Sequence, residues 1–301
     1  MPQDGRVDLE PYRGELVVYC YRMTGSFHDA EDLVQQTMLR AWQARDRYDD
    51  TRASVRTWLY RIATNVCLTA LQGRARRPLP SGLVAASDDP GAPLTPALDI
   101  PWLQPFPDAR TDLRLALVAA MQILPARQRA VLLLREVLQF SAGEVAAQLG
   151  TTVAAVNSTL QRARTALRGV GDIGEVAEPD DPRVRAVIDR YVRAFEAADV
   201  PALVRLLTDD VILEMPPVPL WYRGSRHYGL FMERVFQMRG PGWTARRLTA
   251  NGQPALAAYA PGERFHSLQV FTVAGDRVAH NVVFAGFSFE RAMSPGGAAG
   301  M

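Results

Sequence analysis

The chain contains no lysine, few cysteines and no long hydrophobic run. All 34 basic residues among its 301 are arginines, a bias that reflects coding composition rather than function. No apolar run reaches the roughly 18 residues that a membrane helix needs, and the polar N-terminus lacks the apolar core of a secretion signal. Cys20 and Cys67, the only cysteines, lie in apolar helical patterns. We therefore expect a cytoplasmic protein with two buried free thiols and no membrane contact.

Charge is nearly balanced over the whole chain but uneven along it. The formal net charge is +2, whereas residues 110–170 carry eight arginines against three acidic residues. Such a local excess of positive charge indicates an anionic partner.

Proline content and hydrophobic periodicity divide the chain into domains. Proline removes backbone donors and fixes φ, so the two proline-containing breaks are predicted to be linkers without regular structure. The strand-like runs near the C-terminus alternate or are rich in β-branched residues. The predicted order is an all-α domain (7–77), a Pro-rich linker (78–109), a second all-α domain (110–170), a short linker (171–182), an α+β domain (183–292) and a disordered tail (293–301).

The stretch HDAEDLVQQTMLRAW, residues 28–42, is predicted to form an amphipathic helix. Its buried stripe consists of Ala30, Leu33, Val34, Met38, Ala41 and Trp42. The opposite face carries Asp29, Asp32, Gln35 and Gln36. The pattern alone is compatible with a solvated acidic face and with a docking face for a basic partner.

The next helix, within residues 54–77, combines an apolar stripe with arginines and ends in a basic cluster. Arg and Asn on one helix face suit contacts to phosphates and bases, although a basic surface helix gives the same pattern. Trp58 is assigned to the core rather than to a stacking platform. The candidate DNA contacts are Arg56, Arg61, Asn65, Arg74 and Arg76.

Residues 141–168 have the pattern of a helix-turn-helix. Ser141 and Glu144 form a capping box, Gly150 supplies the turn, and Thr152 can cap the second helix. The polar side chains left for the groove and the phosphates are Thr152, Asn157, Ser158, Gln161, Arg162, Arg164 and Arg168.

The two helical segments together resemble the extracytoplasmic-function sigma factors of bacterial RNA polymerase. HDAEDLVQQTMLRAW and RTWLYRIATNVCLTAL resemble domain 2, and LPARQRAVLLLREVLQFS with the helix-turn-helix resembles domain 4. The resemblance implies that the 28–42 helix docks on the β′ clamp helices of core polymerase, that the 54–77 helix reads the −10 element, and that the helix-turn-helix reads the −35 element. The family often has Lys at the position of Asn157, which leaves one of these contacts open.

The linker between these domains is expected to extend along polymerase between the two promoter elements. Its segment PWLQPFPD is unusually apolar. We interpret this segment as a packing tab against a neighbouring domain.

Residues 183–292 resemble the SnoaL-like branch of the NTF2-like cone fold, in which a curved, mainly antiparallel sheet wraps around helices. Catalytic members of this fold place an Asp or His inside the cavity. The acid–base candidates Asp209, Asp210, His227, His266 and His280 form no convincing pair in the sequence, so no catalytic residue, metal or cofactor is predicted. Met215, Trp221, Tyr222, Asn251, Tyr259 and Phe284 are candidate pocket residues, although a packed core explains them as well.

These features predict a non-enzymatic sigma factor with a fused regulatory domain. We expect this domain to act in cis by contacting domain 2 or the linker, through PWLQPFPD. The expected partners are core polymerase and promoter DNA, and a small-molecule ligand or an anti-sigma protein stays open. Two alternatives are a one-component ligand-responsive DNA-binding regulator and a cyclase- or isomerase-type enzyme fused to a DNA-binding module.

Overall fold

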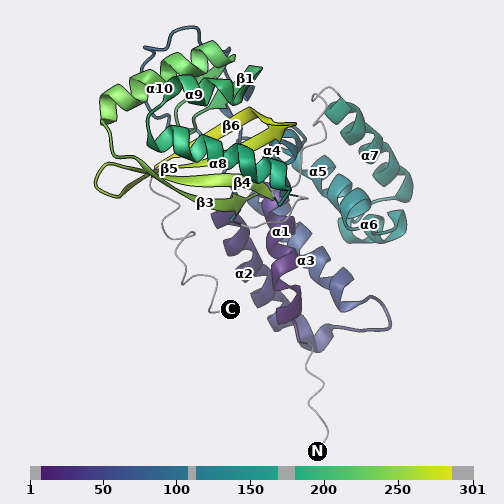
Figure 1. Ribbon diagram of the computed structural model, residues 1–301. Coiled ribbons are helices and arrows are strands. Elements are labelled where there is room, and N and C mark those ends of the chain that lie inside the picture. Colours follow the sequence, from purple (N-terminus) through teal and green to yellow (C-terminus); the bar gives the residue numbers. More distant parts are fainter. Residues whose placement is uncertain (1–7, 108–112, 169–179, 287–301) are drawn as a thin grey trace, which may run out of the picture. The chain divides into compact units, whose positions relative to one another are not determined.

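The computed structural model describes residues 8–107, 113–168 and 180–286, which fall into two compact units (Figure 1). The first unit contains both helical domains, from residues 8–77 and 116–168. The second contains the α+β domain together with residues 78–107 and 113–115. The segment predicted as a linker between the helical domains therefore belongs to the compact unit of the C-terminal domain. The predicted 171–182 linker lies mostly outside the described residues, and the 293–301 tail lies wholly outside them.

The first half of the helical unit is built from well-capped helices. Gly25 adopts φ 70° and ends the first helix, which fits the left-handed C-cap that glycine favours. Ser26 and Ser54 cap the next two helices by accepting hydrogen bonds from the backbone of Asp29 and Thr57. The elements are η1 (Glu10–Tyr12), α1 (Arg13–Thr24), α2 (Phe27–Ala44), η2 (Arg45–Arg47) and α3 (Val55–Ala70).

The second half contains the predicted helix-turn-helix. The Ser141–Glu144 capping box is present in both directions, at 2.7 and 3.2 Å. Gly150 adopts φ 58° in the turn, and Thr152 caps the second helix through the amide of Ala155. The elements are α4 (Leu115–Gln122), α5 (Ala126–Leu132), the π-helical turn η5 (Leu133–Val137), α6 (Ala142–Leu149) and α7 (Val153–Arg168).

The C-terminal domain is a six-stranded sheet with helices, in the strand order β2-β1-β6-β5-β4-β3 (Figure 1). Only β1 and β6 pair in parallel, so the predicted mainly antiparallel sheet is confirmed. The short β2 and the arginine-containing β3 lack a strong strand signal and were not expected individually. The elements are α8 (Pro182–Glu196), α9 (Val200–Arg205), β1 (Leu207–Glu214), β2 (Trp221–Arg223), α10 (Ser225–Arg239), β3 (Thr244–Ala250), β4 (Gln253–Ala260), β5 (Arg264–Ala274) and β6 (Arg277–Ala285).

Both faces of this sheet are buried. One face packs on the helices, with Tyr191, Phe195 and Phe271 in the shared core. The other face also carries buried apolar side chains, including Val270 and Phe284. Because the helices pack on one face, other residues must cover the second face. The segment 78–107, which precedes the sheet in the sequence, forms hydrogen bonds with this domain at several points.

Candidate functional site

The predicted docking face of α2 is exposed over most of its length. Asp32, Gln35 and Gln36 are exposed, and Asp29 is half-buried in the first turn of the helix. Trp42 was predicted to be buried, and this prediction is wrong, because its side chain is 57% exposed. Ala41 takes the buried position, and Trp42 is turned about 100° away from it around the helix. Leu39, three positions before Trp42 and on the same side of the helix, is 55% exposed. The face therefore combines acidic, amide and apolar groups.

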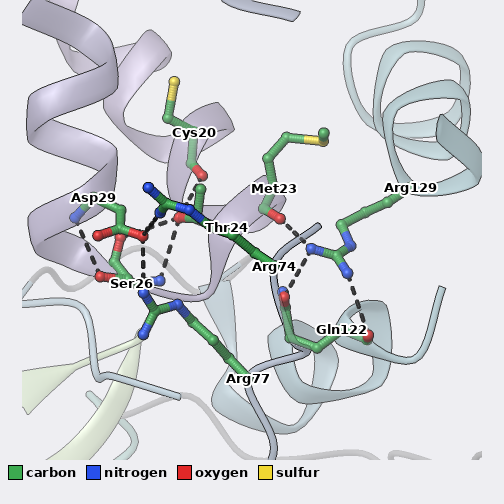
Figure 2. Close-up of polar contacts among 9 residues, drawn as sticks. All are labelled: Cys20, Met23, Thr24, Ser26, Asp29, Arg74, Arg77, Gln122 and Arg129. Carbon is green, nitrogen blue, oxygen red and sulfur yellow. Dashed lines mark hydrogen bonds and ion pairs between the residues drawn. The ribbon is translucent and has the colours of Figure 1, made fainter. Parts of the chain in front are cut away.

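Asp29 does not face solvent alone. Its Oδ2 accepts hydrogen bonds from Arg74 Nη1 at 3.1 Å and from Arg77 Nη2 at 2.8 Å, as Figure 2 shows. These arginines follow α3 in the chain and lie 45 and 48 residues away from Asp29. The structure therefore joins a predicted polymerase contact to a predicted −10 contact, which no local pattern indicates.

The predicted −10 residues divide into engaged and exposed side chains. Arg56 pairs with Glu15 at 3.2 Å and lies over the rings of Tyr60 and Phe140. Arg61, Asn65 and Arg76 are exposed. Trp58 is half-buried, with its ring 4.9 Å from that of Tyr48.

The two cysteines confirm the prediction of buried free thiols. Cys20 and Cys67 are fully buried, and their sulfur atoms lie 3.6 Å apart between α1 and α3. The contact with Cys67, together with burial, raises the pKa of the Cys20 thiol well above its usual value. Both groups therefore act as core side chains in this state.

Arg129 of α5 is a buried cation, with 4% of its surface exposed. Its guanidinium donates to the carbonyl oxygens of Met121 and Leu124. It also donates to the carbonyl and side-chain oxygens of Gln122 and to the carbonyl of Met23 at the end of α1, as Figure 2 shows. Burial lowers the pKa of Arg129 to about 10. Sequence reasoning counted Arg129 among the eight arginines whose charge excess indicates an anionic partner, but its guanidinium is not at the surface.

Gln122 also links the end of α4 to the end of α1. Its Nε2 donates to the carbonyls of Val118 and Arg22, at 3.3 and 3.4 Å. Carbonyls at helix C-termini lack partners within their own helix and carry the negative end of the helix dipole. The ends of α1 and α4 thus supply the negative potential that keeps Arg129 charged without a carboxylate among its described contacts.

The second helix of the helix-turn-helix presents one continuous polar face. Val156, Leu160 and Ala163 form the buried side of this helix. Arg164 pairs with Glu136 at 2.7 Å, and Arg162 donates to Thr159 at 3.1 Å. The predicted −35 residues are all exposed: Thr152, Asn157, Ser158, Gln161, Arg162, Arg164 and Arg168.

The candidate pocket residues of the C-terminal domain are spread over the sheet. Trp221 lies on β2 and Asn251 follows β3, at opposite edges of the sheet. Tyr222 and Met215 belong to the helix-side core, whereas Phe284 is absent from that core cluster. Tyr259 is half-buried and lies 5.1 Å from the guanidinium of Arg246. The chain thus folds these side chains onto separate parts of the sheet, and a pocket that they line together stays a prediction.

Three of these residues, Trp221, Tyr222 and Asn251, instead bind the preceding segment. Trp221 Nε1 donates to the carbonyl of Val84 at 2.9 Å, and the Tyr222 hydroxyl donates to that of Asp89 at 2.9 Å. On α10, Arg234 donates to the carbonyls of Pro90 and Ala92. The proline-rich linker thus has ordered contacts although it has almost no regular structure.

Asn251 makes the most complete of these contacts. Asn251 and Gly252 adopt φ 54° and 63°, as in the two-residue turn that an Asn-Gly pair favours between antiparallel strands. The Asn251 side chain accepts from Phe106 N and donates to Leu113 O, both at 2.7 Å, and its backbone donates to Phe106 O at 2.8 Å. Trp102, Leu103 and Phe106 are buried, and Phe106 ties this part of PWLQPFPD to the C-terminal domain, whereas its last residue, Asp108, lies outside the described residues.

An acid–base pair that sequence reasoning missed lies near the other end of the linker. Glu214 is 1% exposed and bonds His280 at 3.0 Å, while its second oxygen accepts from Ser81 N at 2.8 Å. The pairing of β1 with β6 brings the two side chains together across 66 residues, which local pattern cannot reveal. Because a linker amide occupies this carboxylate, the pair serves as an anchor in this state.

The other acid–base candidates have separate surroundings. Asp209 and Asp210 are exposed on β1, and His227 Nδ1 lies 3.0 Å from the carbonyl of Arg223. Burial, with a contribution from Arg239, lowers the pKa of His266 to about 4. No two of these five candidates are within hydrogen-bond reach of each other among the described contacts.

The interior of the domain contains a buried cluster of neutral polar groups. The hydroxyls of Tyr191 and Tyr228 lie 2.6 Å apart, and Asn281 Nδ2 donates to Tyr228 at 2.7 Å and to Gln269 Oε1 at 3.0 Å. Burial raises the pKa of Tyr228 to about 12. These hydroxyl and amide groups bond one another and fix the helices to the sheet.

Family comparisons agree with the division into two helical modules and a sheet domain. Residues 9–77 match the sigma-70 region 2 family, residues 114–167 match sigma-70 region 4, and residues 188–281 match the SnoaL-like domain family. The combination defines the class of sigma-type transcription initiation proteins. No helix within the described ranges is long and apolar enough to cross a membrane.

Relatives define the family more narrowly. The chain is 48% identical to the ECF RNA polymerase sigma factor SigG of Mycobacterium tuberculosis over 93% of this chain and 81% of that protein. It is 29% identical to SigJ of the same species over 85% and 80% of the two chains. The SigJ crystal structure matches with a TM-score of 0.62 and 25% identity, over 93% of this chain and 96% of that one. The chain belongs to the extracytoplasmic-function sigma factors.

Proposed function

We propose that this chain directs RNA polymerase to its promoters and that its C-terminal domain regulates this activity in cis by holding the linker. The exposed α2 face would bind the β′ clamp helices of core polymerase. The polar face of α7 would read the −35 element, and the arginines and Asn65 of the α3 region would contact the −10 element. The wide exposure of both faces supports these roles.

The contacts of Asn251 with Phe106 and Leu113, here called the clasp, support the regulatory part of the proposal. A linker that joins the −10 and −35 domains has to follow polymerase while both elements are bound. Here the linker is fastened to the C-terminal domain at Glu214, Trp221 and Asn251. We therefore infer that the domain restrains initiation until the linker is released, and that it acts as a binding module rather than a catalyst.

The clasp can be weakened without disturbing the turn. In Asn251→Gly, glycine accepts the positive φ of this position, and the side-chain bonds to Phe106 and Leu113 are lost. Leaving two buried backbone groups without partners costs about 2 kcal/mol or more, roughly a thirtyfold shift toward the released linker. We expect run-off transcription with purified core polymerase to rise several-fold on a promoter selected from genomic fragments.

A control at a second turn position with positive φ is Glu263→Gly, which changes an exposed residue with φ 57° and no described linker contact. Its transcription should equal that of the unchanged chain. If Asn251→Gly also leaves transcription unchanged, the linker is not the point of control, and the sigma assignment is unaffected. If no form transcribes any fragment or binds core polymerase, the assignment of activity itself fails.

A further inference from the structure

Asp29 has two competing roles in this molecule. It lies on the face proposed to bind core polymerase, yet its carboxylate is bonded to Arg74 and Arg77 (Figure 2). We propose that these arginines mask Asp29 in the free chain and that core polymerase displaces them, which releases them for the −10 DNA. This inference rests on the proposed polymerase-binding function and deepens it.

The charges around Asp29 prevent its carboxylate from binding the two arginines and core polymerase at the same time. In this contact one carboxylate faces two guanidinium groups. A basic surface that approaches Asp29 is repelled while both arginines stay. Both arginines also use the same oxygen, Oδ2, and the side chains of Arg77 and Asp29 are only 16% and 26% exposed.

The chain is built to let the arginines move. They follow the end of α3 and come after Gly73, which adopts φ 69° and has no atom within 4 Å of the position where a Cβ would lie. Arg74 is 55% exposed, so its bond to Asp29 is screened by water. An intramolecular pair of this strength can be exchanged for a partner that offers several contacts at once.

The exchange would couple the two binding events. Polymerase binding at Asp29 frees two cations for phosphates, and the free chain lacks these cations for DNA. Core polymerase and the −10 strand would then each favour the binding of the other, as reciprocal linkage requires.

The decisive variant is Asp29→Asn in the full chain, compared with Asp32→Asn. Both lose one charge on the same helix face, but no described contact ties Asp32 to an arginine. The probe is a fluorescent non-template-strand oligonucleotide from a promoter that the chain transcribes, without polymerase. We expect Asp29→Asn to bind it roughly fivefold more tightly than the unchanged chain. The slope of log affinity against log salt should steepen by about 1.4 if both arginines reach phosphates. Asp32→Asn should leave DNA binding unchanged.

The affinity for core polymerase gives a second test of the proposed exchange. Asp29→Asn and Asp32→Asn should both weaken core binding, whereas Arg74→Gln with Arg77→Gln should strengthen it, because two positive charges beside the Asp29 carboxylate are removed. A merely structural role of the cluster predicts that both kinds of variant weaken binding. The double arginine variant keeps the question decidable if Asp29→Asn proves unstable.

The failures are distinguishable. If Asp29→Asn weakens core binding but leaves free-chain DNA binding unchanged, the exchange is wrong and the proposed function stands. If the unchanged chain does not bind core polymerase at all, the proposed function falls first.

Discussion

At the scale of single residues, the least expected group is the buried guanidinium of Arg129. Removing one partner of a buried charge is costly, because the remaining groups stay buried without bonds. In Arg129→Ala, the carbonyls of Met121, Gln122, Leu124 and Met23 lose their donor. We expect the free energy of unfolding to fall by about 3 kcal/mol, measured by urea denaturation.

Arg127 is the control for this prediction. It lies on the same helix, is exposed and makes one described bond, to Leu149 O at 3.0 Å. Arg127→Ala should change stability by no more than about 0.5 kcal/mol. Equal losses for the two variants would contradict the account of Arg129 as an internal tie.

Residue roles are also where sequence reasoning was weakest. The caps at Ser141 and Thr152 follow from residues three positions apart, so the sequence could predict them. The bonds between Asp29 and Arg77, or between Asn251 and Phe106, join groups 48 and 145 residues apart. No periodicity encodes such distances, and the burial of Arg129 follows only from where two helix ends meet.

At the scale of elements, α2 presents two large exposed apolar side chains, Leu39 and Trp42. Aromatic anchors carry a large share of binding energy at protein interfaces. We expect Trp42→Ser to weaken core polymerase binding about tenfold, with little change in stability because the ring is already exposed. Fluorescence titration with labelled core would measure the effect.

A matched surface change is Met238→Ser on α10, whose side chain is 49% exposed. It should bind core polymerase as the unchanged chain does. Normal affinity of Trp42→Ser would remove the apolar part of α2 from the proposed interface.

The periodic elements were the most predictable part of the fold. The buried stripe of α7 and the exposed face of α2 follow from helical spacing. Trp42 was misassigned because it borders the stripe, and only the position of the neighbouring helices decides such an edge. The strands β1, β4, β5 and β6 carry clear β patterns, whereas β2 has three residues and offers too little pattern.

At the scale of the whole molecule, the linker belongs to the compact unit of the C-terminal domain, although in the sequence it joins the two helical domains. The apolar tab around Trp102 and Phe106 signalled a packing site in the sequence, but it could not specify the surface. A truncation before residue 180 would bare this tab, which is buried in the intact chain. Effects of such a truncation would therefore mix regulation with exposure of apolar surface.

We propose that the linker lies on the C-terminal domain in the free chain and leaves it during initiation. Hydrogen exchange of the backbone amides reports this directly, because amides in stable contacts are protected. We predict that Ser81, Ser87 and Phe106, whose amides bond to the C-terminal domain, exchange slowly in the free chain. They should exchange much faster in the complex with core polymerase and promoter DNA. Equal protection of these amides in both states, in a complex that transcribes, would contradict the account.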